Sequence, residues 1–76
     1  MKDFHQTQTA NIWMQKVFDA KSARQGRVVR RSLRDIDNIV GREQFETEIR
    51  RRGYHAVRNG DQVVVFCNNQ PVQVMC

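Results

Sequence analysis

The dipeptide Asn59-Gly60, lying between two β-branched segments, constrains the fold of this chain more than any other feature. Asn-Gly is the strongest short signal for a two-residue β-hairpin loop, because a type I′ turn needs positive φ at both central positions. The flanking segments 54–58 and 61–67 are rich in valine and aromatic residues, as strands are. The sequence therefore predicts an antiparallel hairpin.

A two-residue loop also fixes which residues face each other across the hairpin. The predicted pairs are Arg58 with Asp61, Val57 with Gln62, Ala56 with Val63, His55 with Val64 and Tyr54 with Val65. A second two-residue loop at Asn68-Asn69 would add a third strand, with Val72 opposite Val65 and Val74 opposite Val63. The core face of the sheet would then hold Tyr54, Ala56, Val63, Val65, Val72 and Val74.

Two segments before the hairpin have a helical pattern. Residues 11–24 place Trp13, Met14, Val17 and Phe18 on one broad apolar face, and Gly26 is a suitable stop. An aromatic and methionine cluster of this kind is more typical of a packed core than of a ligand site. Residues 1 to about 9 are polar, and we expect them to fray.

A short strand over 27–31 is expected at a sheet edge, because charged residues flank its valines. Ser32 and Asp35 then form a capping box that opens a helix ending at Gly41. The next helix, 42–52, carries Phe45 and Ile49 as its buried pair and ends at Gly53. Its expected ion pairs, four residues apart and acid first, are Glu46 with Arg50 and Glu48 with Arg52.

These elements define the expected fold class and domain organisation. We predict a single α+β domain over residues 1–76, with two or three short helices packed on a small three- or four-stranded, mainly antiparallel sheet. A chain of 76 residues buries only about 60% of its unfolded surface. Little structure is left over to wall an active-site cleft, so we expect a protein that is not an enzyme.

The second face of the predicted sheet is too apolar to be fully exposed to water. It holds His55, Val57, Val64, Phe66 and Met75, which we take as a protein-interaction surface. Three covers are possible for this face. They are the helix that carries Trp13 and Phe18, a second copy of the chain, and a nucleic-acid base stacked on Phe66 or His55.

The charge of the chain favours a polyanionic partner. Thirteen Lys and Arg oppose eight Asp and Glu, which gives a net charge of +5, and ten of the thirteen are Arg. Arginine makes bidentate bonds to phosphate and stacks on bases. We therefore expect nucleic acid, RNA or DNA, to be bound by Arg27, Arg30, Arg31, Arg34, Arg50, Arg51 and Arg58. The competing interpretation of the run 50–52 is a solvated helix face neutralised by its own glutamates.

No residue pattern indicates catalysis, a metal site or a cofactor. His5, His55, Cys67 and Cys76 lack the short spacings of metal ligands, and no glycine-rich phosphate loop is present. No segment approaches the ~20 apolar residues of a membrane span. We expect a cytoplasmic protein with reduced thiols, a nucleic-acid or protein partner, possible self-association, and no membrane contact.

The segments 28–32, 40–42, 48–55 and 62–68 resemble a group of short bacterial proteins that often carry the label phosphoribosylanthranilate isomerase. That enzyme is an eight-fold β/α barrel of about 200 residues or more, so the resemblance implies neither its activity nor its catalytic residues here.

The order of a helix, Gly53-Tyr54, a strand, Arg58, Gly60 and two further strands is similar to HicA-type toxins. These toxins are small ribonucleases with a double-stranded-RNA-binding-like fold. Their catalytic histidine follows the hairpin glycine, where this chain has Asp61 and Gln62. A degenerate ribonuclease of this kind would need His55 as its acid–base group.

Overall fold

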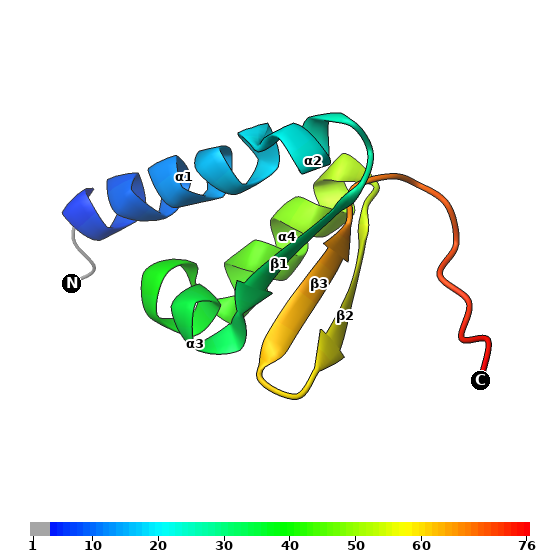
Figure 1. Ribbon diagram of the computed structural model, residues 1–76. Coiled ribbons are helices and arrows are strands. Elements are labelled where there is room, and N and C mark those ends of the chain that lie inside the picture. Colours follow the sequence, from blue (N-terminus) through cyan, green and yellow to red (C-terminus); the bar gives the residue numbers. More distant parts are fainter. Residues whose placement is uncertain (1–3) are drawn as a thin grey trace.

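A computed structural model describes residues 4–76 of the chain, with side chains described from residue 9 onward. Its elements, in chain order, are α1 (Phe4–Asp19), α2 (Lys21–Arg24), β1 (Val28–Ser32), α3 (Leu33–Asp35), the π-helical turn η1 (Ile36–Val40), α4 (Arg42–Arg52), β2 (His55–Asn59) and β3 (Gln62–Phe66). Helices packed on a small antiparallel sheet confirm the predicted α+β fold class (Figure 1).

The sheet has the strand order β1-β3-β2, with both pairings antiparallel. The predicted edge strand is confirmed as β1, which pairs with β3 from Val28 opposite Phe66 to Ser32 opposite Gln62. The strand expected from Val72 to Val74 is wrong, because β1 takes the edge of β3 on which that strand would have paired. Residues 67–76 contain no strand, so the third hairpin strand expected by similarity to HicA toxins is not formed either.

The hairpin is present, but its loop is Gly60-Asp61 and not Asn59-Gly60. Asn59 pairs with Gln62 and Arg58 with Val63, so the predicted pairing of Arg58 with Asp61 is wrong. Gly60 has a φ of 62°, and no non-glycine residue among those described has a positive φ. This geometry fits a type II′ turn, which needs positive φ only at its first central residue, whereas a type I′ turn would also need positive φ at Asp61.

The register error leaves the faces of the sheet unchanged. The observed pairing differs from the predicted one by two residues, and side chains alternate with a period of two. Ala56, Val63 and Val65 therefore still share one face, while His55, Val57, Val64 and Phe66 share the other.

The first helix is longer than predicted and ends earlier. It starts at Phe4 and not near Asn11, so residues 4–9, expected to fray, are helical, while residues 1–3 lie outside the described part of the chain. It also stops at Asp19, because Ala20 is extended, with φ −60° and ψ 151°, and begins the separate short helix α2. This break turns the chain so that Ala23 packs into the core.

The two helices between β1 and β2 agree with the sequence prediction. Ser32 Oγ accepts a 3.0 Å hydrogen bond from the Asp35 amide, as half of the capping box requires. Gly41 separates η1 from α4 with a φ of 97°, and Gly53 ends α4 in the left-handed conformation. At both positions the positive φ favours glycine over any residue with a Cβ.

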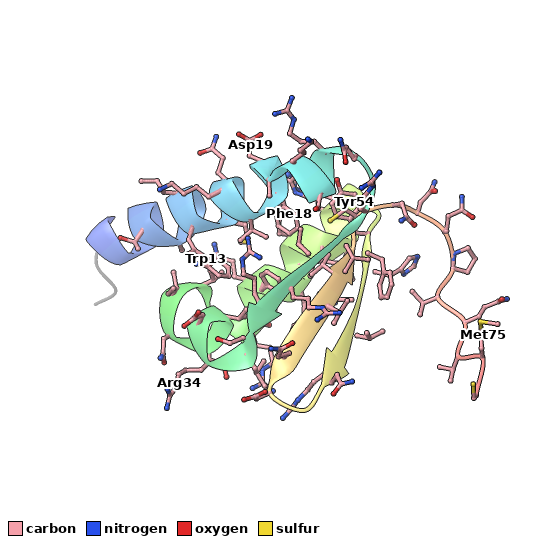
Figure 2. The ribbon with its side chains drawn as sticks, viewed as in Figure 1. Trp13, Phe18, Asp19, Arg34, Tyr54 and Met75 are labelled. Atoms are coloured by element: carbon pink, nitrogen blue, oxygen red, sulfur yellow. The ribbon has the colours of Figure 1, made fainter. Side chains whose placement is uncertain are left out.

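The core lies between the helices and one face of the sheet. Phe45 is its centre, with ring centroids 6.1 Å from Trp13 and 6.2 Å from Phe18, and Phe18 also lies 5.8 Å from Tyr54 (Figure 2). Val63 and Val65 supply the sheet side of the core. The helix that carries Trp13 and Phe18 thus packs on the same face as α4, so it is not the cover of the other face, for which it was one of three candidates.

Candidate nucleic-acid interface

The loop end of the sheet gathers three of the predicted arginines. Arg31 on β1 and Arg58 on β2 both face Val63 of the central strand. Neighbouring strands are about 4.8 Å apart, so the two Cα atoms are on the order of 10 Å from each other. Arg34 follows in the first turn of α3, which is fixed beside the loop by the 2.7 Å hydrogen bond from the Leu33 amide to the Asp61 carbonyl.

The three side chains differ in how free they are. Arg34 is exposed and points away from the body of the protein in Figure 2. The Arg58 guanidinium folds back and donates a 2.8 Å hydrogen bond to the Gly60 carbonyl, and Arg31 donates to the carbonyl of Arg30. These bonds use one donor each, and a guanidinium has five, so all three can still bind an anion.

A fourth arginine at this end, Arg42, was not predicted as a site residue. It donates hydrogen bonds of 3.2 and 2.8 Å to the two carboxylate oxygens of Asp37. The hydrogen bonding from Arg42, together with the charges of Arg42 and Arg58, lowers the pKa of Asp37. No sequence signal identifies this pair, because residues five apart do not face each other on an α-helix; the π-helical turn and Gly41 bring them together.

The run Arg50-Arg51-Arg52 is largely paired with glutamates of its own helix. Arg50 lies 3.9 Å from Glu46, while Arg51 and Arg52 lie 2.6 and 2.7 Å from the same Glu48 oxygen. Hydrogen bonds from Arg51, and secondarily from Arg52, lower the pKa of Glu48. Arg52 also lies 4.5 Å above the Phe18 ring. The predicted pairs are confirmed, and only Arg50, with its long and exposed contact, remains well placed to bind a partner.

A groove runs between α4 and β2 and connects Arg50 to the loop end. Its volume is about 490 Å³, with a floor that includes Phe45, Ile49 and Val63. Arg42, Arg50 and Arg58 stand along its rim together with Glu46. The groove exists because α4 does not extend over β2, all of whose residues are exposed.

Most of the net charge lies elsewhere, in the segment 16–30. Five basic side chains and one acidic side chain give it a net charge of +4, out of +5 for the whole chain. The five are exposed, and none forms an ion pair with another described side chain; they are Lys16, Lys21, Arg24, Arg27 and Arg30. Sequence reasoning missed the first three, although a running charge count along the chain would have found them.

Arg27 and Arg30 are separated from the other predicted arginines. Arg27 precedes β1 at the end of the sheet opposite the hairpin loop, and its amide donates a 2.8 Å hydrogen bond to the Ser22 carbonyl of α2. Arg30 faces Val64 and therefore lies on the sheet face that the helices do not cover. The seven predicted arginines thus do not form one patch.

The uncovered face of the sheet brings together four of the five predicted protein-interaction residues. Phe66 lies between Val28 and His55 in one row, and Val64 between Arg30 and Val57 in the next. Val28 and Val57 are 38% and 37% exposed, so no described segment of the chain covers them. Met75 is not part of this face, because it lies in the extended segment after β3.

The remaining chemistry-bearing residues do not form a site in the described part of the chain. No three or more of its His, Cys, Asp and Glu residues group closely enough to hold a metal ion. Cys67 and Cys76 are both free thiols, the first buried and the second exposed.

Comparison with known proteins gives no further guide to function. No protein-family model, curated protein or solved structure matches the chain. Within the described residues no helix is long and apolar enough to cross a membrane.

Proposed function

We propose that this protein binds double-stranded DNA with α4 in the major groove and the β2–β3 loop beside the phosphate backbone. The observation that carries the proposal is the helix pair α3–η1 and α4, joined at Gly41 and followed directly by the β-hairpin. In helix-turn-helix proteins the second helix of such a pair enters the major groove. By analogy, this order of elements is of the winged helix-turn-helix type, and the argument for function rests on the side chains.

The dimensions of α4 favour DNA over RNA. Its 11 residues make a rod of about 16 Å in length. A helix of ordinary diameter fits the major groove of B-DNA, which is about 12 Å wide. The major groove of A-form RNA is too deep and narrow for side chains to reach the bases.

Two side chains on α4 suit base recognition. Arg50 and Glu46 are exposed on the side of the helix away from the core, at the rim of the groove. Arginine recognises guanine through two hydrogen bonds, and a glutamate accepts one from the cytosine amino group. A helix that carries both signs of charge gains little from phosphate attraction alone, so its contribution is mainly to specificity.

We assign the phosphate contacts to the arginines beside the hairpin loop. We assign the long-range attraction of DNA to the opposite end of the molecule, which carries α2. Arg34 and Arg58 flank the hairpin loop, where they would lie next to a DNA backbone once α4 enters the groove. The segment 16–30, with its net charge of +4, would raise the encounter rate without contacting the bases.

The test compares two double substitutions of equal charge. Arg34→Ala/Arg58→Ala removes two positive charges at the loop end, and Lys21→Ala/Arg24→Ala removes two at the far end. Fluorescence anisotropy with a random duplex pool at two salt concentrations should show a larger loss of affinity for the first variant. Its salt-dependence slope should fall by about 2, since each lost phosphate contact lowers the slope by about 1.

Three outcomes would contradict the proposal. They are no duplex binding at low salt, equal losses for the two variants, and a preference for single-stranded RNA.

A protein-interaction module is the second candidate, favoured by the uncovered apolar sheet face around Phe66. Phe66→Asp distinguishes the two functions, because it should disrupt a protein complex through that face and leave DNA binding by α4 unchanged.

A further inference from the structure

We propose that the segment 72–76 of one copy of this chain binds as an added strand to the outer edge of β2 in a second copy, in a reciprocal exchange. The inference is independent of DNA binding. It rests on two features that have no partner within the described residues, one an unpaired strand edge and the other an exposed segment with the pattern of a strand.

The first feature is the outer edge of β2. In the order β1-β3-β2 the central strand is paired on both sides, and β2 on one side only. Asn59 and Gln62 close the two-residue loop as a hydrogen-bonded pair. Along antiparallel strands, pairs that are hydrogen-bonded to each other alternate with pairs whose N–H and C=O groups point away from the partner strand. The backbone N–H and C=O groups of Ala56 and Arg58 therefore point outward, where an incoming strand can bind them.

Nothing on β2 blocks this edge. Arg58 is its only charged side chain among residues 55–59, and its guanidinium is folded back onto the Gly60 carbonyl. Charged side chains usually protect strand edges from pairing, and here that protection is limited to the loop end.

The second feature is the segment after β3. Val72 and Val74 alternate with Gln73 and Met75, a pattern typical of a strand, yet both edges of β3 are taken. Val74 and Met75 are 88% and 94% exposed. Figure 1 shows this segment leaving the sheet and running outside the body of the protein.

A second copy is a better acceptor than the same chain. The start of the segment is held on the β1 side of β3, by hydrogen bonds of 2.9 Å from the Cys67 amide to the Arg27 carbonyl and from Asn68 Nδ2 to the Gly26 carbonyl. Along its own β2 edge the segment would have to run parallel to β2, because β3 ends beside the start of β2. A second copy allows the more stable antiparallel pairing.

The side chains of the added strand suit both faces of the sheet. With Val72 and Val74 on the side of Ala56, they would narrow the groove between β2 and α4, whose floor is apolar. Met75 would then lie on the opposite face, beside Val57. Residues 68–76 include no charged side chain, so the strand meets no repulsion from the arginines of the rim.

The experiment measures solution mass by light scattering after gel filtration, over a range of protein concentrations. The full chain should have twice its 9.0 kDa monomer mass. Val74→Asp/Met75→Asp places charge on the exchanged strand and should give a monomer, without risk to the fold because both side chains are exposed. Asn69→Asp/Gln70→Asp adds the same charge before the strand and should remain a dimer.

A second pair of variants tests the edge. Ala56→Pro removes the outward N–H of β2, which forms no bond to β3, so this variant should be a folded monomer. Ala56→Thr keeps the N–H and should still dimerise. Mixing Ala56→Pro with Val74→Asp/Met75→Asp should restore a heterodimer, because one intact edge then meets one intact strand. No symmetric contact between identical faces can produce this rescue.

Four results would overturn the proposal. They are a monomeric wild-type chain, a dimer that survives Val74→Asp/Met75→Asp, a dimer dissociated by Phe66→Asp but not by the strand variants, and a mixture that stays monomeric. The DNA-binding variant Arg34→Ala/Arg58→Ala should still dimerise, so the failure of one proposal is distinguishable from the failure of the other.

Discussion

Asp37 and Arg42 face each other across Gly41, joined by two hydrogen bonds between carboxylate and guanidinium of 2.8 and 3.2 Å. The pair links η1 to α4 on the exposed side of the turn at Gly41. The charges of Asp37 and Arg42 cancel, so the pair adds no net charge to the candidate DNA-binding end.

This pair should make stability depend on acid pH. The pKa of Asp37 is lowered in the folded state, so its stabilising effect is present above the unfolded pKa of about 3.9 and is lost as the pH falls through the folded value. Urea unfolding of Asp37→Asn should therefore show a smaller decrease in stability between about pH 6 and about pH 3 than the wild type. An equal decrease would show that the pair does not couple to folding.

The type II′ loop predicts unequal effects of alanine at its two neighbouring positions. Gly60→Ala puts a Cβ at a φ of 62° and should lower the free energy of unfolding by about 1–2 kcal/mol. Asn59→Ala lies on the strand with negative φ and should cost much less. Chemical denaturation of both variants checks this, and equal large losses would indicate a type I′ loop at Asn59-Gly60 instead.

The two thiols should react at very different rates. Cys67 is buried, and burial raises the pKa of its thiol, so little thiolate is present at neutral pH. Cys76 is exposed. A thiol reagent such as DTNB should modify one cysteine rapidly in the native protein and both in denaturant, and Cys76→Ser should abolish the rapid phase. Two rapid equivalents in the native wild type would place Cys67 outside the core.

Glu46 should restrain nonspecific DNA binding. It lies 3.9 Å from Arg50 on the exposed side of α4, where a carboxylate both repels phosphate and competes for the guanidinium. Glu46→Gln should raise affinity for a random duplex several-fold and steepen its salt dependence. Asp19→Asn removes the same charge near α2 and should have a smaller effect; if the two variants are equal, the α4 face is not the DNA contact.

Much of the fold could be predicted from local sequence because local rules decided it. Ser32 and Gly41 delimit the third helix, while Phe45 and Ile49 identify the buried side of α4. The two faces of the hairpin were also correct, since an error of two residues in register preserves the alternation of side chains. The ion pairs of α4 followed from i,i+4 spacing alone.

The candidate site was predicted less well, because the arginines were counted without regard to the carboxylates that pair with them. The run 50–52 looked like a binding patch, but Glu48 occupies two of its three arginines. Arg34 and Arg58 are 24 positions apart in sequence and belong to one end of the molecule only because β1 and β3 pair. Lys21 and Arg24 were passed over, although they lie in the most basic segment.

The sequence by itself determined the limits of the two helical segments before the hairpin, which residues face the core, and that a hairpin forms around Gly60. These features depend on backbone conformation and on contacts a few residues apart. Only the tertiary structure decided which strand lies beside β3, because Val28–Ser32 and the valines after Pro71 both have strand character and compete for the same edge. That competition leaves the segment 72–76 without a strand partner among the described residues, while the outer edge of β2 is free in either arrangement.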